Sequence, residues 1–257
     1  MKPVQRPGEP RSLRIGASAA AREHARESAR AHLRAVARRH IAERGLADLS
    51  LRAVARELNM TSSAIYRYYA SREELIGSLI AESYEDLALI AETTDRQQAG
   101  QGVDAAGRWL AICRELRNWA GLHPHDYSLI HSSPVIDQAS PLPIREATVR
   151  IWRVIAGIVD TAVTTGALHP PARPFEVGGL IADHVLASVS RQAPPFTDYI
   201  IRAMALFSSL LGAIAAEMFG LFDGLAHDAD RVFDLVVATG AAGVGLELPV
   251  HADPRRE

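Results

Sequence analysis

Apolar residues recur every three or four positions along most of the chain, and this spacing is the strongest constraint on its fold. The pattern is typical of amphipathic helices, whereas a half-buried strand would alternate apolar and polar residues. No run of alternating β-branched residues indicates a sheet, so we expect an all-α protein of about nine or ten helices. The predicted helices are at about 22–44, 51–58, 62–68, 72–92, 104–120, 123–130, 144–165, 175–192, 197–222 and 229–246.

Charge is divided unevenly along the chain, although the formal net charge is only −2. Residues 1–72 hold 15 Lys and Arg against 6 Asp and Glu, whereas residues 73–257 hold 13 against 24. This asymmetry indicates that the N-terminal part meets a polyanion such as nucleic acid. The alternative is a solvated helical face, because 27 of the 28 basic residues are arginine.

The sequence argues against membrane and secreted proteins. The longest uncharged apolar run, residues 203–216, is shorter than the roughly 18 residues that a membrane helix needs. No apolar segment near the N-terminus resembles a signal peptide, so we expect a cytoplasmic protein without a membrane partner. The single cysteine, Cys113, allows neither an intramolecular disulfide nor a cysteine-based zinc site.

No pattern in the sequence points to catalysis. The pairs His123/His125 and Asp183/His184 form neither an HExxH motif nor a paired-carboxylate metal motif. A nucleophile elbow around a serine and a glycine-rich phosphate loop are also missing from the sequence. We therefore predict no enzyme, no catalytic residue, no metal site and no cofactor.

The chain divides into four predicted parts. Residues 1–20 are rich in proline, glycine and arginine and are predicted to be a flexible basic arm. Residues 21–72 contain three helices, of which the second and third are short and are joined by about three residues. Residues 73–248 are predicted to be a larger helical domain, and residues 249–257 a tail.

The two short helices match a helix-turn-helix, in which the second helix enters the major groove of DNA. Asn59 sits in the connecting turn and is the non-glycine residue that best tolerates positive φ. Ser50 and Thr61 are predicted to be the N-caps of the two helices. The following aromatic residues divide, with Tyr69 expected in the core and Tyr66 and Tyr68 at the surface.

Residues 35–75 resemble the DNA-binding domain of tetracycline-repressor-like (TetR family) regulators. The resemblance is carried above all by residues 45–55 and 63–75. Four positions depart mildly from the family pattern, since Asn59 replaces the usual turn glycine, Tyr68 a histidine, Tyr69 a phenylalanine and Arg72 a lysine. Arg72 keeps the cation, and Tyr69 adds a hydroxyl that needs a partner if it is buried.

The resemblance implies a bacterial homodimeric transcriptional regulator, usually a repressor, which a small molecule releases from a palindromic operator in double-stranded DNA. Arg52 suits either base or phosphate contact. The candidates for reading bases are Ser62, Ser63 and Arg67, and those for binding phosphate are Ser50, Thr61, Tyr66, Tyr68 and Arg72. Arg6, Arg11 and Arg14 either enter a neighbouring minor groove or belong to a disordered tail. The alternative function is a ligand-independent or architectural DNA-binding protein.

The C-terminal part resembles a subtype of this family that is named for a Trp-His-Gly signature. The likeness comes from Trp119, His123-Pro124, Tyr127 and Ser133-Pro134, while the segment that corresponds to the signature keeps only Gly212. In the family the last two helices form the dimer interface, although intrachain core explains the same apolar residues nearly as well. The candidate interface residues are Leu210, Ile214, Met218, Phe219 and Val236.

A ligand pocket is expected between the helices of the C-terminal domain. Each candidate residue has core filling as its alternative role. The candidates are Trp109, Cys113, Tyr127, Trp152, Ile155, His184 and Met204. Their chemistry favours a small, largely apolar or aromatic effector.

Overall fold

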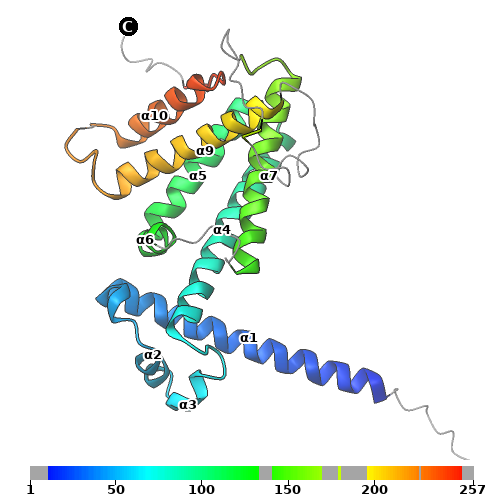
Figure 1. Ribbon diagram of the computed structural model, residues 1–257, viewed down its shortest axis with the longest axis vertical. Coiled ribbons are helices and arrows are strands. Elements are labelled where there is room, and N and C mark those ends of the chain that lie inside the picture. The colour runs from blue at the N-terminus through cyan, green and yellow to red at the C-terminus, as the bar shows by residue number, and fades with distance from the viewer. Residues whose placement is uncertain (1–10, 133–140, 170–178, 181–195, 226, 251–257) are drawn as a thin grey trace, which may run out of the picture. The chain divides into compact units, whose positions relative to one another are not determined.

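The computed structural model describes residues 11–132, 141–169, 179–180, 196–225 and 227–250 (Figure 1). Within these residues nine α-helices form, and the only β-structure is an isolated bridge between Leu168 and Leu246. The prediction of an all-α protein is confirmed. The predicted helix at 175–192, with the candidate His184, lies outside the described residues.

The chain folds as two compact units, Met1–Ile80 and Ala81–Glu257. The elements of the first unit are α1 (Arg11–Arg44), the 3₁₀ turn η1 (Leu46–Asp48), α2 (Leu51–Glu57), α3 (Ser62–Ile65) and the start of α4 (Arg72–Gly100). The second unit holds the rest of α4, α5 (Ala105–Leu122), α6 (Pro124–Ser132), α7 (Leu142–Thr164), α9 (Phe196–Met218) and α10 (Ala229–Gly243).

Two helices are longer than the sequence analysis predicted. Helix α1 begins at Arg11, so residues 11–20 are helical rather than part of an irregular arm, and residues 1–10 lie outside the described residues. Alanine and arginine are strong helix formers, and no proline follows Pro10 in this segment. Helix α4 likewise continues to Gly100, beyond the predicted end at about residue 92.

The core of the first unit forms between α1 and α2. One face of α1 buries Leu33, Val36 and Ala37, which repeat at helical spacing as predicted. Helix α2 buries Val54 and Ala55 against this face. These contacts fix the two helices that support the following turn and α3.

In the second unit α5 lies beneath two long C-terminal helices. Figure 1 shows α9 and α10 running side by side and crossing α5, with α7 next to α9. The guanidinium of Arg117 on α5 donates to Glu217 of α9, at 2.6 and 2.5 Å, and to Asp230 of α10 at 2.7 Å. Arg117 also lies over the ring of Phe233, 4.8 Å from its centroid. One side chain therefore connects α5 to both C-terminal helices.

Helix α9 passes a test of length and composition that the core helices of soluble proteins also pass, so the expectation of no membrane span stays a prediction. Its segment Ile200–Met218 is 19 residues long with a mean hydropathy of 1.6, which is long and apolar enough to cross a membrane by length and composition alone. This segment contains Arg202, whose side chain is buried and donates to the carbonyl oxygen of Val244 at 2.8 Å. Only 33% of the segment is buried within the chain, and its exposed residues are Met204, Ala205, Ser208 and Gly212.

Candidate nucleic-acid interface

The turn between α2 and α3 depends on Asn59. Its φ is 54°, the left-handed conformation that the sequence analysis predicted for this residue. The amide of Met60 then donates back to the carbonyl oxygen of Ala55 at 2.9 Å, which closes the end of α2. The turn thus sets α3 at a fixed angle to α2, as a helix-turn-helix requires.

Helix α3 is shorter than predicted and ends at Ile65 instead of continuing to Tyr68. The amides of Arg67 and Tyr68 donate to residues three positions earlier, at 3.2 and 2.9 Å, so the last turn tightens to 3₁₀ geometry. We call residues 61–68 the recognition segment. Residues 62–65 of this segment are α-helical, and residues 66–68 form a turn.

The recognition segment has one buried and one exposed side. Ile65 is fully buried and Tyr69 just after the segment is 2% exposed, which confirms that Tyr69 belongs to the core. Tyr66 is 47% exposed, and Tyr68 is half-buried. The other exposed residues of the segment are Thr61, Ser62, Ser63 and Arg67. A side that combines hydroxyls, a phenol and a cation suits contact with DNA bases and phosphates.

Two arginines of α1 hold the end of the recognition segment in place. Nη2 of Arg30 donates to the carbonyl oxygen of Tyr68 at 3.1 Å, and Nη1 of Arg34 donates to the hydroxyl of Tyr69 at 3.4 Å. The second bond supplies the partner that the buried phenol of Tyr69 needs. The sequence analysis did not find these roles, because an arginine on a polar helix face gives no sign of its partner.

Ser50 and Thr61 occupy the predicted N-cap positions, but neither side chain caps its helix. The hydroxyl of Thr61 instead lies 3.1 Å from that of Ser63. Both N-cap residues are exposed. Their hydroxyls, and the amides at the start of α2 and α3, are therefore available to an anion such as a phosphate.

Arg72 has a structural role that the sequence analysis did not predict. Its Nε donates to the carbonyl oxygen of Leu49 at 3.0 Å, and Nη2 donates to that of Leu46 at 2.5 Å. The side chain thus ties the start of α4 to the turn η1. Arg72 remains about one-third exposed, so a phosphate contact would share the guanidinium with these two carbonyl groups.

The start of α4 is capped by local side chains. The hydroxyl of Ser71 accepts from the amide of Glu74 at 3.1 Å. The carboxylate of Glu74 reaches back, but it accepts from the amide of Ala70 at 2.6 Å instead of that of Ser71. This shift by one residue keeps both donors satisfied, which is the purpose of a capping box.

Helix α2 carries the exposed Arg52 near its start, and Glu57 at its end contacts two residues of α1. The carboxylate of Glu57 pairs with Arg39, and it accepts a hydrogen bond from Nε2 of His40 at 2.6 Å. These contacts, the bond with His40 first, hold the pKa of Glu57 below its ordinary value. Because His40 of α1 is buried, the pair joins the end of α2 to α1.

The pocket candidates of the second unit occupy different environments. Trp109, Cys113, Tyr127 and Ile155 are buried. Trp152 is half-buried with its ring 5.2 Å from that of Phe207, and Met204 is 46% exposed. Burial raises the pKa of the Cys113 thiol and raises that of Tyr127 to about 12, so both stay neutral.

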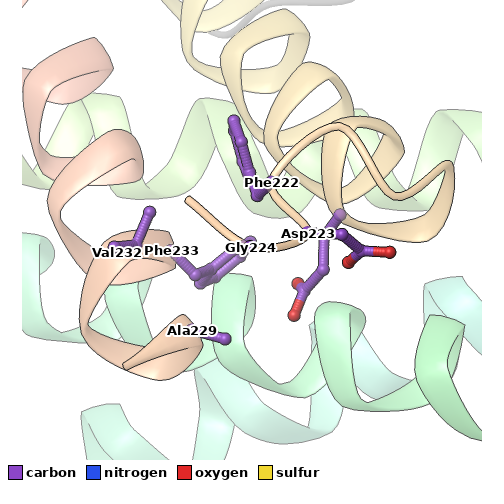
Figure 2. A pocket seen from close by; sticks show the side chains of 7 residues that line it. Phe222, Asp223, Gly224, Ala229, Val232 and Phe233 are labelled. Atoms are coloured by element: carbon purple, nitrogen blue, oxygen red, sulfur yellow. The ribbon is translucent and has the colours of Figure 1, made fainter. Parts of the chain in front are cut away.

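A small cavity lies between α10 and the loop that follows α9. Figure 2 shows Phe222 and Asp223 of the loop near Ala229, Val232 and Phe233 of α10. The cavity has a volume of about 160 Å³, and none of the described pocket candidates lines it. Among the described residues, no group of three or more His, Cys, Asp and Glu side chains is arranged to hold a metal ion.

The dimer candidates divide into buried and exposed residues. Leu210 is 1% exposed and Ile214 is 3% exposed, so both belong to the core of the chain and are not available to a partner. This corrects the prediction for these two residues, since their side of α9 packs against the neighbouring helices. Met218 and Val236 are half-buried, and Phe219 is 63% exposed.

Comparison with known families gives two matches that together cover both units. Residues 33–79 match the sequence profile described as bacterial regulatory proteins, tetR family. Residues 109–239 match that described as a tetracyclin repressor-like, C-terminal domain. The more specific Trp-His-Gly subtype stays a prediction.

Individual proteins with similar sequences or structures include transcriptional regulators. The HTH-type transcriptional regulator Rv1816 of Mycobacterium tuberculosis is 34% identical over 202 residues, which cover 76% of this chain and 82% of the relative. The crystal structure of the regulatory protein SCO4313 has a TM-score of 0.61 at 28% identity, covering 86% of this chain and 98% of the other. A protein from Rhodococcus sp. RHA1 has a TM-score of 0.64 at 19% identity, covering 84% and 95%, and shows the shared fold.

Proposed function

Because the chain belongs to the tetR family of bacterial transcriptional regulators, we propose that it is a homodimeric repressor that a small molecule releases from its operator. The observation that carries the proposal is the recognition segment. Its buried side, at Ile65 and Tyr69, fixes the orientation of its exposed hydroxyls and Arg67. A rigid, polar rod of this kind fits the major groove.

The exposed residues divide by the contacts that suit their chemistry. Arg67 can pair with both acceptors of a guanine, and Ser62 and Ser63 can approach base edges closely. Ser50, Thr61, Tyr66, Tyr68 and Arg72 are proposed to bind phosphates, and Arg52 suits either role. Phosphate contacts fix the register on the duplex, while the base contacts select the sequence.

Replacing Arg67 by alanine should relax the sequence preference at one position of each half-site. We expect a loss of about 1–3 kcal/mol against the preferred base and little change against the other three. The measurement is a gel-shift titration of a duplex that the full-length chain selects from a random pool, with all four bases at each position.

The matched control is Arg56→Ala, which removes an exposed arginine from α2 instead of the recognition segment. This control should leave the base preference unchanged. If the chain selects no sequence and binds random DNA equally well, the architectural alternative replaces the proposed function. A reporter placed behind the selected site then distinguishes repression from activation.

A homodimer is proposed to form through α9 and α10. Exposed apolar side chains occur on both helices and the loop between them, at Met204, Phe219, Leu221, Leu225 and Leu235. Exposed apolar side chains of this kind are what a partner subunit covers. An isologous two-fold dimer would present two recognition segments to a palindrome.

The effector is proposed to bind near Trp109. Its indole Nε1 is buried and has no hydrogen-bond partner among the described residues. Such a donor is unfavourable in an apolar core, and an effector with an acceptor group would satisfy it. The 160 Å³ cavity beside α10 is smaller than the roughly 300–1,000 Å³ of a typical ligand pocket.

A thermal-shift screen of small aromatic and apolar compounds tests this site. A true effector at 100 times its dissociation constant should stabilise the protein by about 2.7 kcal/mol and release the selected duplex. Trp109→Phe should weaken that compound about fivefold by removing one hydrogen bond. Trp119→Phe, which alters an indole stacked on His123, is the control. Equal affinity for both variants would exclude Trp109 as the donor.

A further inference from the structure

Helix α1 continues well beyond the domain that it helps to build. Its buried face begins at Leu33, whereas residues 20–28 are exposed on every side of the helix. We call residues 11–29 the overhang, which is about five helical turns long. Figure 1 shows the overhang projecting past α2 and α3. The tetR-family profile begins at residue 33, so the overhang precedes the part of the domain that the family shares.

Two arginines of the overhang lie in line with the core face of α1. Arg22 precedes Leu33 by eleven residues, and Arg26 precedes Ala37 by the same interval. Eleven residues are close to three turns of α-helix, so each arginine lies on the same side of α1 as its buried counterpart. That side is the one against which α2 packs. The arginines therefore extend, beyond the core, the side of α1 that supports the helix-turn-helix.

The overhang is held in register with the recognition segment. Arg30 directly follows the overhang, and its bond to the carbonyl oxygen of Tyr68 fixes the end of the recognition segment to α1 at this point. Arg26 and Arg22 lie one and two turns further along, at about 6 and 12 Å from Arg30 for a rise of 1.5 Å per residue. A duplex bound to the recognition segment would therefore pass close to both side chains.

The chemistry of the overhang suits a polyanion better than a protein or a membrane. The only apolar side chains larger than alanine in the overhang are Leu13 and Ile15, and residues 19–29 contain none, so the overhang has no continuous apolar stripe to bury. A membrane-surface helix would need such a stripe. Of its two acidic residues, Glu27 is already paired with Arg34 at 2.9 Å. Four arginines, at positions 11, 14, 22 and 26, outnumber these two acidic residues, and guanidinium groups bind phosphates well.

We propose that the overhang binds the DNA backbone that flanks the operator half-site, with Arg22 and Arg26 as phosphate contacts. This inference rests on the proposed function, because it requires a duplex on the recognition segment. A helix of this length extends about 27 Å, which corresponds to roughly eight base pairs of duplex. Since these contacts are made to phosphates, the flank adds affinity without adding sequence preference.

The test compares the double variant Arg22→Gln/Arg26→Gln with Arg145→Gln/Arg153→Gln, which removes two exposed arginines from α7. The probe is the duplex that the full-length chain selects, either with twelve random base pairs on each side or trimmed to the selected site. On the long duplex we expect the salt slope of the first variant to fall by about 1.8 for each half-site. At 0.15 M salt its affinity should fall about 30-fold for each half-site, or about 900-fold for a dimer on the palindrome, whereas the trimmed duplex should show less than a twofold change.

Each other outcome overturns the inference. If the wild type selects no sequence, the proposed function fails and the inference fails with it. If the selected duplex is bound but both variants keep the same slope, only the overhang's role is refuted. The last measurement tests binding to vesicles of phosphatidylserine. Binding to them that Arg22→Gln/Arg26→Gln abolishes, together with an unchanged DNA slope, would assign the overhang to a membrane surface.

Discussion

Replacing both Phe219 and Leu235 by aspartate is expected to convert the proposed dimer to a monomer and to lower operator affinity by about 100-fold or more. The two residues are 63% and 45% exposed in the single chain, so the change does not disturb its own core. In a dimer they would be covered, and each new carboxylate would have to lose its water without a partner. The affinity falls because a linked second half-site contributes roughly 10²–10⁴-fold.

Sedimentation equilibrium gives the mass of the variant, and a gel shift with the selected palindrome gives its affinity. Leu122→Asp is the matched control, since Leu122 is 69% exposed at the end of α5 in the same unit. The control should remain dimeric with unchanged affinity, and both variants should keep the helical circular dichroism of the wild type. A double variant that still sediments as a dimer would rule out this surface as the interface.

Local signals in the sequence were sufficient to predict the helix-turn-helix. The positive φ of Asn59 follows from the tolerance of its own side chain, and the burial of Tyr69 follows from its spacing from Ile65. The all-α class follows in the same way from apolar periodicity. Such features depend on residues a few positions apart, which is why no tertiary information was needed to find them.

The faces of α9 could not be predicted in this way. This helix is apolar on nearly every side, so periodicity does not show which side meets α5 and α7 and which remains exposed. Leu210 and Ile214 were therefore predicted as interface residues although they belong to the core. Phe219, which directly follows the helix, is exposed as the interface proposal requires.

The contacts of long side chains were also not predicted from the sequence. Arg72 reaches carbonyl groups more than twenty residues earlier, and Arg30 reaches one 38 residues later. A guanidinium on an exposed helix looks the same in sequence whether it meets water, a carbonyl group or a phosphate. The start of α1 was missed for a related reason, because a helix rich in alanine and arginine has no apolar period to detect.

Gly245→Ala should destabilise the second unit by about 3 kcal/mol or more. Gly245 has a φ of 89°, and a Cβ atom there would lie 2.1 Å from the carbonyl oxygen of His169. That oxygen belongs to backbone that cannot move freely, because the amide of His169 donates to the carbonyl oxygen of Gly245 at 2.7 Å. The same contact forms the bridge between Leu168 and Leu246, which are both buried. The substitution therefore combines backbone strain with loss of a buried contact.

Gly166→Ala separates these two effects. Gly166 has a φ of 70°, but a Cβ atom there would meet nothing within 4 Å, so only the backbone strain remains. We expect about 1 kcal/mol for this control, a shift of roughly 2–4 °C in Tm, against about 6–12 °C for Gly245→Ala. The bridge holds the C-terminal end of α10, and Leu235 of the proposed interface lies on the same helix. The Gly245 variant should therefore also dimerise less well. Equal thermal shifts for the two variants would show that the contact with His169 does not hold α10 in place.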